Sequence, residues 1–244
     1  MIDSNLKSFS ERILIFAGAY GSGKTEVAVN YALSLTNDSA NQPLSIIDLD
    51  IVNPYFRSRE ARVEMESRGI KVIMPLGEHC HADLPIIVPQ IKATLEEDDG
   101  KVILDVGGDD LGARVLSSMI DVFEEREYQF LLVLNANRPF TSTADGAQKM
   151  LRAIEESSRL KFTGIVSNTH LIGETTPKTV MQGIELSKQV SEATGLPLVF
   201  ATAMEEVIGQ MNPGAAGVPL FSLGRRMLKP WERFKNRKIT LRDL

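Results

Sequence analysis

Short apolar runs alternate with longer amphipathic stretches along most of the chain. The spacing of the amphipathic stretches is helical, and the short runs are typical of strands buried on both faces. The apolar runs predict strands at Arg12–Ala17, Leu44–Asp48, Lys71–Met74, Val102–Asp105, Phe130–Leu134, Phe162–Ser167 and Leu198–Ala201. The amphipathic stretches predict helices at Lys24–Leu35, Ser58–Arg68, Ala113–Arg126, Ala144–Arg159 and Pro177–Thr194. This alternation predicts an α/β fold, with a mostly parallel central sheet of about seven strands and helices on both faces.

Composition agrees with a large aliphatic core. The chain has 244 residues, of which 43% are hydrophobic and only 6% aromatic. That length suits one α/β domain, although two small domains would also fit. The single cysteine, Cys80, excludes a disulfide within the chain and favours a reducing compartment. The first twelve residues lack a signal-peptide core, and no apolar run reaches the roughly 20 residues of a membrane span. We therefore expect a cytoplasmic location without a membrane span.

The charge is unevenly distributed. A net charge of −5 does not predict binding to nucleic acid. Residues 223–244 contain eight basic and two acidic residues, so this stretch carries a net charge of +6. We divide the chain into a domain over residues 1–222 and a basic C-terminal segment over residues 223–244. The segment is interpreted as a solvated helix or a tail on an acidic body, the alternative being an acidic partner or membrane surface.

A glycine-rich loop between the first strand and the first helix carries the strongest chemical signal. It matches the Walker A pattern G-x-x-x-x-G-K-[ST] in full. Its residues are Gly18, Ala19, Tyr20, Gly21, Ser22, Gly23, Lys24 and Thr25. Glycines allow consecutive backbone N–H groups to surround an anion, and the following helix directs its positive end at the phosphates. A glycine-rich turn without a ligand is the alternative. We predict that residues 18–26, Glu26 included, bind a nucleoside triphosphate, with Lys24 on the β- and γ-phosphates and Thr25 on Mg²⁺.

Carboxylates at two other strand ends complete the predicted site. Asp48 and Asp50 are two residues apart, so in an extended chain both side chains point the same way. They follow a strand, where open α/β sheets bind ligands. We predict that Asp50 orients or activates the attacking water and that Asp48 supports Mg²⁺. Alternatively, one of them caps the turn before Asn53-Pro54.

The segment KVILDVGGDD supplies the other carboxylate. Asp105 ends an apolar strand in the Walker B arrangement and is predicted to hold Mg²⁺. Gly107 and Gly108 allow a backbone N–H to approach the γ-phosphate, so this loop can report the triphosphate. Asp109 and Asp110 are interpreted as solvated charges or a helix cap, with a site role as the alternative.

Together these segments resemble the MinD/ParA/CobQ branch of the SIMIBI class of P-loop NTPases. The resemblance lies in Ile13–Thr25, Asp48–Asp50 and Asp105–Gly108 and extends from about Ile13 to Ala203. It implies an ATP-dependent switch or slow hydrolase that acts on a protein partner or as a homodimer. Many members have a second lysine after the first loop glycine, where this chain has Ala19. Dimer activation through that lysine is therefore not expected.

The segment Gly164–Leu171 bears on the choice of base. GTP-binding relatives have an [NT]-K-x-D motif, whereas this chain has Asn168-Thr169-His170-Leu171, without the lysine and the aspartate. Asn168 offers a donor and an acceptor, which match the edge of adenine. The resemblance also implies this base-reading role. We expect ATP rather than GTP; a turn role for Asn168 is the alternative. The segment Ala201–Val207 could also line the base.

Weaker signals keep two other functions open. Arg57, Arg59 and Arg138 could bind a small acid in an ATP-dependent ligase of the CobQ or dethiobiotin-synthetase type. Alternatively, Arg57 and Arg59 pair with surface neighbours, and Arg138 lies in a turn with Pro139 before a helix cap. His79-Cys80-His81 could hold a metal in a nucleotide-dependent metallochaperone. Adjacent residues rarely bind one metal together, which favours a surface loop instead.

Overall fold

The computed structural model describes residues 9–38, 42–50, 62–74, 80–108, 110–212 and 214–226. Eight strands form one sheet within these residues, in the order β3-β2-β4-β1-β5-β6-β7-β8. Their bounds are β1 Ile13–Ala17, β2 Leu44–Leu49, β3 Ile70–Ile73, β4 Lys101–Val106, β5 Tyr128–Leu134, β6 Gly164–Ser167, β7 Leu198–Met204 and β8 Leu220–Leu223. All seven neighbouring pairs are parallel, which confirms the predicted α/β class.

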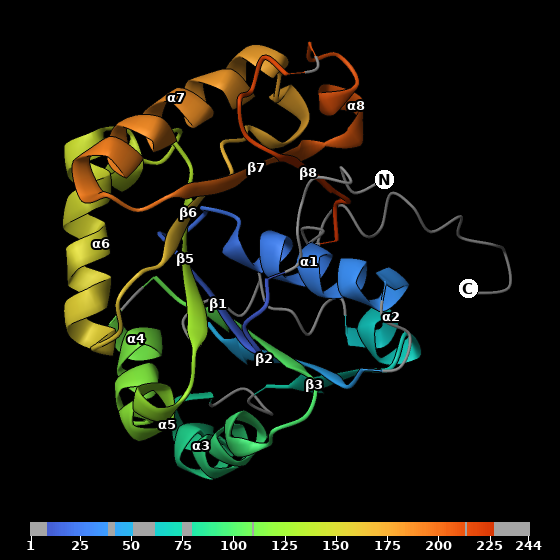
Figure 1. The fold of residues 1–244 in the computed structure, drawn as a ribbon, viewed down its shortest axis with the longest axis vertical. Coiled ribbons are helices and arrows are strands. Elements are labelled where there is room, and N and C mark those ends of the chain that lie inside the picture. The colour runs from blue at the N-terminus through green and yellow to red at the C-terminus, as the bar shows by residue number, and fades with distance from the viewer. Residues whose placement is uncertain are drawn as a thin grey trace, which may run out of the picture.

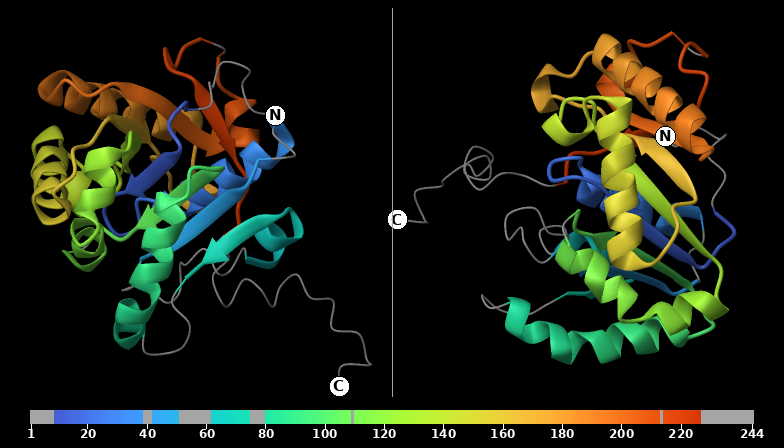
Figure 2. Two further views of the ribbon diagram at one scale, coloured as in Figure 1. Left: turned by 60° about the horizontal axis from the view of Figure 1, so that its bottom comes forward. Right: turned by 90° about the vertical axis from the view of Figure 1, so that its left-hand side faces the viewer.

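Helices cover both faces of this sheet (Figure 1). They are α1 Lys24–Asp38, α2 Arg62–Ser67, α3 Cys80–Glu96, α4 Asp110–Ser117, α5 Ile120–Glu125, α6 Ala144–Ser158, α7 Pro177–Thr194 and α8 Glu205–Ile208. Short 3-10 turns lie at Pro139–Thr141 and Ile172–Glu174. Figure 2 shows the same arrangement from two further directions.

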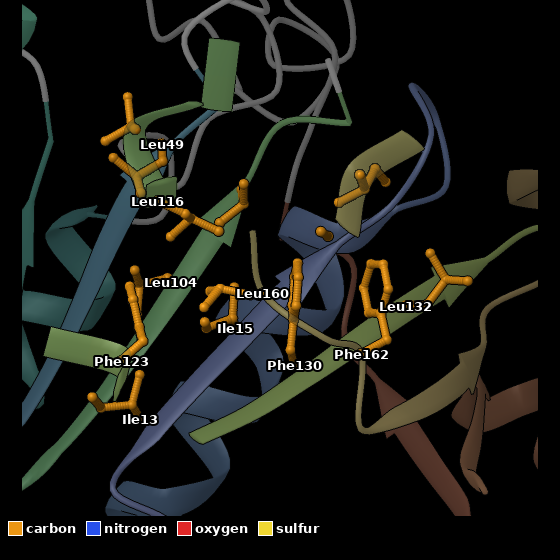
Figure 3. Close-up of a cluster of buried hydrophobic side chains, with 14 of the residues drawn as sticks. Ile13, Ile15, Leu49, Leu104, Leu116, Phe123, Phe130, Leu132, Leu160 and Phe162 are labelled. Atoms are coloured by element: carbon orange, nitrogen blue, oxygen red, sulfur yellow. The ribbon is translucent and has the colours of Figure 1, made fainter. Parts of the chain in front are cut away.

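Alternate residues of each central strand enter two separate cores, as the pleat requires. Ile13 and Ile15 of β1 face α3–α7, whereas Leu14 and Phe16 face α1 and α2. Figure 3 shows the first core, where the rings of Phe130 and Phe162 stack with centroids 4.0 Å apart. Because every residue of β1 is buried, the loop that follows starts from a fixed strand end.

Three details differ from the sequence-based elements. The helix predicted over Ala113–Arg126 is two helices, α4 and α5, because the backbone leaves helical geometry at Met119 (φ −119°, ψ 24°). Helix α3 was not predicted, since Pro85 and Pro89 within it are poor helix formers. Strand β8 was not predicted; it crosses the predicted boundary at 222 and ends one residue beyond it, at Leu223. The division into 1–222 and 223–244 remains a prediction, because residues 227–244 lie outside the described part.

Candidate functional site: a phosphate loop with buried carboxylates

The glycine-rich loop lies between β1 and the first turn of α1, as predicted. Gly21 and Gly23 have positive φ values of 73° and 82°, which side chains rarely adopt. A Cβ at Gly23 would also lie only 2.2 Å from Nδ2 of Asn168. The glycine at position 23 is therefore required both by the backbone and by the neighbouring loop.

Lys24 and Asp50 form a buried ion pair at this loop. Lys24 Nζ lies 2.6 Å from Asp50 Oδ2, and the two side chains are 6% and 2% exposed. Burial disfavours the charged amine, but the nearby carboxylates of Asp50 and Asp105 outweigh burial and raise the pKa of Lys24. Lys24 therefore remains a full positive charge in the site.

Thr25 and Asp105 form a second buried contact. The Thr25 hydroxyl donates to Asp105 Oδ2 over 2.6 Å, and Asp105 is fully buried. Asp105 pairs in register with Asp48 across β4 and β2, and Asp48 Oδ1 accepts the backbone N–H of Asp50 over 3.0 Å. Three carboxylates from two neighbouring strands thus converge on the side chains of Lys24 and Thr25.

This cluster fits a divalent cation. Burial, together with the charges of Asp48 and Asp50, raises the pKa of Asp105 to about 8, although Lys24 opposes that shift. Oδ1 of Asp105 and Oδ1 of Asp50 are buried without a hydrogen-bond partner in the described structure. Buried carboxylate oxygens of this kind are the ligands that Mg²⁺ prefers. No three His, Cys, Asp or Glu side chains of the described residues form a complete metal cage. A bound Mg²⁺ would therefore also use water and phosphate oxygens, as it commonly does.

The loop after β4 lies directly against the phosphate loop. A Cβ at Gly108 would lie 2.1 Å from the carbonyl oxygen of Gly18 and 3.0 Å from Cα of Ala19. Only glycine permits this approach. This close approach places Gly107-Gly108 beside the glycine-rich loop. That a backbone N–H of Gly107-Gly108 contacts a γ-phosphate remains a prediction.

Asn168 links the phosphate loop to β7. Its Nδ2 donates to the carbonyl of Ser22 over 2.6 Å, and its Oδ1 accepts from the Thr202 hydroxyl over 2.5 Å. Each amide group therefore already has one partner, and each retains capacity for one more hydrogen bond. No motif in the sequence indicates that Asn168 holds the glycine-rich loop in place. The predicted contact with the base remains a prediction.

A cavity of about 680 Å³ opens beside the loop. Its walls include Lys24, Thr25, Glu26, Asp50 and Asn168, so the predicted residues from three strand ends meet at one space. Residues 202–204, 206 and 207 also line the cavity, which agrees with the expected place of the segment Ala201–Val207. At this volume the cavity lies within the range of small-molecule sites.

Several lining residues were not anticipated. They are His170, Ile172, Gly173, Thr175, Gln210, Leu223 and Arg225. Arg138, which sequence analysis left between a ligand and a turn role, lines the cavity and donates from Nε to the carbonyl of Gly21 over 2.7 Å. The many basic residues after position 223 were evident in the sequence. No motif, however, indicated that they lie near the glycine-rich loop, about 200 positions earlier.

Other predicted positions lie outside the described residues. Arg57, Arg59, His79 and Asp109 belong to this group, as do the side chains of Cys80, His81 and Asp110. Within the described ranges, no helix is both long enough and apolar enough to cross a membrane.

The sheet order, the loop after β1 and the carboxylates after β2 and within β4 are those of a P-loop NTPase fold, similar to that of the SIMIBI class. No family model matches the sequence, and no curated protein matches it. Among solved structures, the chain resembles FtsY from Mycoplasma mycoides, with 13% identity and a TM-score of 0.51 over 80% of this chain and 60% of that one. It also resembles chloroplast FtsY from Physcomitrella patens, with 16% identity and a TM-score of 0.53 over 81% of this chain and 60% of that one.

A third similar structure is FlhF complexed with GTP/Mg²⁺, with 16% identity and a TM-score of 0.51 over 82% of this chain and 68% of that one. At such identities the likeness concerns the fold alone. The chain spans 60% of the length of both FtsY chains. FtsY and FlhF share the SIMIBI class with the MinD/ParA/CobQ branch, and assignment of this chain to that branch remains a prediction.

Proposed function

We propose that this chain binds Mg²⁺–ATP in the cavity, hydrolyses it slowly and acts as a nucleotide-dependent switch on a partner. One observation carries the proposal: Lys24, Thr25, Asp50 and Asp105 meet at one glycine-rich loop in two buried contacts, each 2.6 Å long. A buried cation and backbone donors suit a polyphosphate, and paired carboxylates suit the accompanying metal.

Each residue has a distinct proposed task. The Lys24 ammonium moves from Asp50 to the β- and γ-phosphate oxygens, and backbone N–H groups of the loop hold the β-phosphate. Thr25 and Asp105 would hold Mg²⁺ through their side-chain oxygens, with support from Asp48. When bound, the ion would neutralise charge on the phosphates. Asp50 then orients the water that attacks the γ-phosphate.

A partner surface is supported by the exposed apolar side chains. Among the described residues, the large hydrophobic side chains that remain exposed are Tyr20, Val63, Phe140, Leu171 and Ile172. Four of these follow the carboxyl ends of β1, β5 or β6, at the sheet edge that carries the cavity. A partner or second copy bound there would contact the loops that enclose the phosphates.

The proposal is tested with Lys24→Ala and Asp50→Ala. Lys24→Ala removes the cation, so we expect at least tenfold weaker binding of ATP in calorimetry with Mg²⁺. Asp50→Ala is expected to keep binding but to slow phosphate release. Lys149→Ala is the control, because Lys149 is a surface lysine paired with Asp145 on α6. Undetectable binding of any nucleotide by the wild type would refute the proposal, and unchanged hydrolysis by Asp50→Ala would remove Asp50 from the mechanism.

GTP is the second candidate, because FlhF was solved with GTP/Mg²⁺. Guanine needs an acceptor for its N1 and N2 hydrogens, and the segment Asn168–Leu171 has no carboxylate. Glu206, however, lines the cavity and carries one. Competition between ATP and GTP for the wild type and Glu206→Gln decides the base. We expect ATP to be preferred and Glu206→Gln to bind it unchanged; GTP preference lost in Glu206→Gln would assign guanine.

A further inference from the structure

The start of the basic C-terminal segment lies close to the glycine-rich loop and helix α1. Residues Gly224, Arg225 and Arg226, here called the clasp, follow β8 and lie against α1 and α2. The buried side chain of Asn30 forms hydrogen bonds with both backbone groups of Gly224. Its Nδ2 donates to the Gly224 carbonyl and its Oδ1 accepts the Gly224 N–H, each over 2.8 Å. These two bonds join positions 194 residues apart in the sequence.

Arg226, which follows Arg225, is also held by hydrogen bonds to the helices. The backbone N–H of Arg226 donates to the carboxylate of Glu26. Its guanidinium donates to both carboxylate oxygens of Glu64 on α2, over 2.9 and 3.0 Å. Because both neighbours are bonded to the helices, the backbone of Arg225 has a fixed position. Strand β8 is anchored in turn, since the ring of Phe221 packs edge-on against Tyr31 of α1 with centroids 6.0 Å apart.

The fixed Arg225 lines the same cavity as Lys24, Thr25 and Glu26. This wall is the first turn of α1, which directs its N–H groups and positive dipole end toward a bound phosphate. Leu223, the last residue of β8, lines the cavity as well. Arg225 therefore forms part of the cavity wall on the side where the phosphates are predicted to bind.

The charge balance of the cavity depends on Arg225. Without it the described lining has two cations, Lys24 and Arg138, against three carboxylates, Glu26, Asp50 and Glu206, and Arg225 brings the formal sum from −1 to zero. A triphosphate carries about four negative charges, and one Mg²⁺ neutralises only about half of them. Arg225 is the cation that the clasp places beside the first turn of α1.

We infer that Arg225 binds the phosphate groups of the nucleotide, so that the start of the basic C-terminal segment is part of the binding site. The inference rests on the proposed function and adds a ligand that lies outside the Walker motifs. A guanidinium suits this task, because it presents several donors in a planar fork that matches phosphate oxygens.

The experiment compares Arg225→Ala, Arg225→Gln and Arg225→Lys with the wild type. Binding of ADP, AMP and adenosine is measured by calorimetry, with the guanosine series used instead if the wild type prefers GTP. We expect Arg225→Ala and Arg225→Gln to bind ADP and AMP about tenfold more weakly, as loss of one charge-assisted hydrogen bond predicts. Arg225→Lys should be intermediate, and adenosine should bind all variants equally. Arg152→Ala, an exposed arginine on α6 away from the cavity, is the matched control.

The outcomes separate this inference from the proposed function. Wild-type protein that binds no nucleotide overturns both. Wild-type protein that binds ADP, with Arg225→Ala and Arg225→Gln binding it equally well, overturns only the role of Arg225. Adenosine weakened as much as AMP also overturns a phosphate contact. Melting temperatures of the unliganded variants within about 2 °C of wild type show that a loss of affinity is local.

Discussion

His170 lies on the cavity wall beside Arg138, and its environment keeps the imidazole neutral. Burial, reinforced by the positive charge of Arg138, lowers the pKa of His170 to about 4 from an ordinary value of 6.5. Asn137 Nδ2 donates to the carbonyl of His170 over 3.4 Å, which ties the turn after β6 to the one after β5. The histidine could be read from the sequence, but its neutral state depends on an arginine 32 positions away.

The shift of this pKa makes stability depend on pH. Between pH 6.5 and 4 the unfolded chain binds a proton at His170 and the folded chain does not, so stability falls as pH falls through this window. His170→Gln should reduce the loss by on the order of 2 kcal/mol, discounted for partial exposure. Urea unfolding of both proteins at pH 7 and pH 4.5 measures the difference. Parallel pH dependence in the two proteins would contradict the assignment.

Helices and strands with a clear periodic pattern of hydrophobic residues could be predicted from the sequence. The β1–loop–α1 unit was found because a buried run, a complete Walker pattern and a helical stretch follow one another. The side-by-side position of Asp48 and Asp105 followed from strand ends that meet at one sheet edge. Strand β8 has only four residues and ends in a basic stretch, so its pattern is too short to separate from a loop.

Two hydrogen bonds between the Asn30 side chain and the backbone of Gly224 join helix α1 to the residue that follows β8. Asn30→Ala leaves an N–H and a carbonyl of Gly224 without their partner, so we expect a loss of about 2 kcal/mol in the free energy of unfolding. Thr36→Ala on the same helix is the control, because Thr36 bonds only the carbonyl of Leu33 in its own helix. Denaturant titrations measure both. Equal values for the two variants would show that the bond contributes nothing.

At the scale of the molecule, one sheet edge collects the functional side chains. The loop after β1, the ends of β2, β4 and β6 and the segment Ala201–Val207 supply the predicted residues, whereas the turn after β6, the end of β8 and the clasp supply the unpredicted part of the cavity. Sequence periodicity fixes which residues leave a strand at its end. It does not fix which distant loops close over the same space, because this depends on the order of strands in the sheet.

Ligand binding should be visible in global stability. A nucleotide at a hundredfold excess over its Kd adds about 2.7 kcal/mol to a folded state that alone binds it. For a chain of this size we expect the melting temperature to rise by roughly 5–10 °C with Mg²⁺–ATP. Removal of Mg²⁺ with EDTA should reduce the rise, and Lys24→Ala, with binding at least tenfold weaker, should reduce it to about half or less. The prediction fails if Lys24→Ala is stabilised by the nucleotide as strongly as the wild type.

The ion pair between Lys24 and Asp50 has a consequence for the timing of chemistry. In this structure the Asp50 carboxylate is paired with the Lys24 ammonium, so it does not serve as a proton acceptor. Under the proposed function, a γ-phosphate that draws the ammonium away would release Asp50 to orient water. A triphosphate would then promote its own hydrolysis, whereas a diphosphate, which lacks that group, would leave Asp50 paired with Lys24.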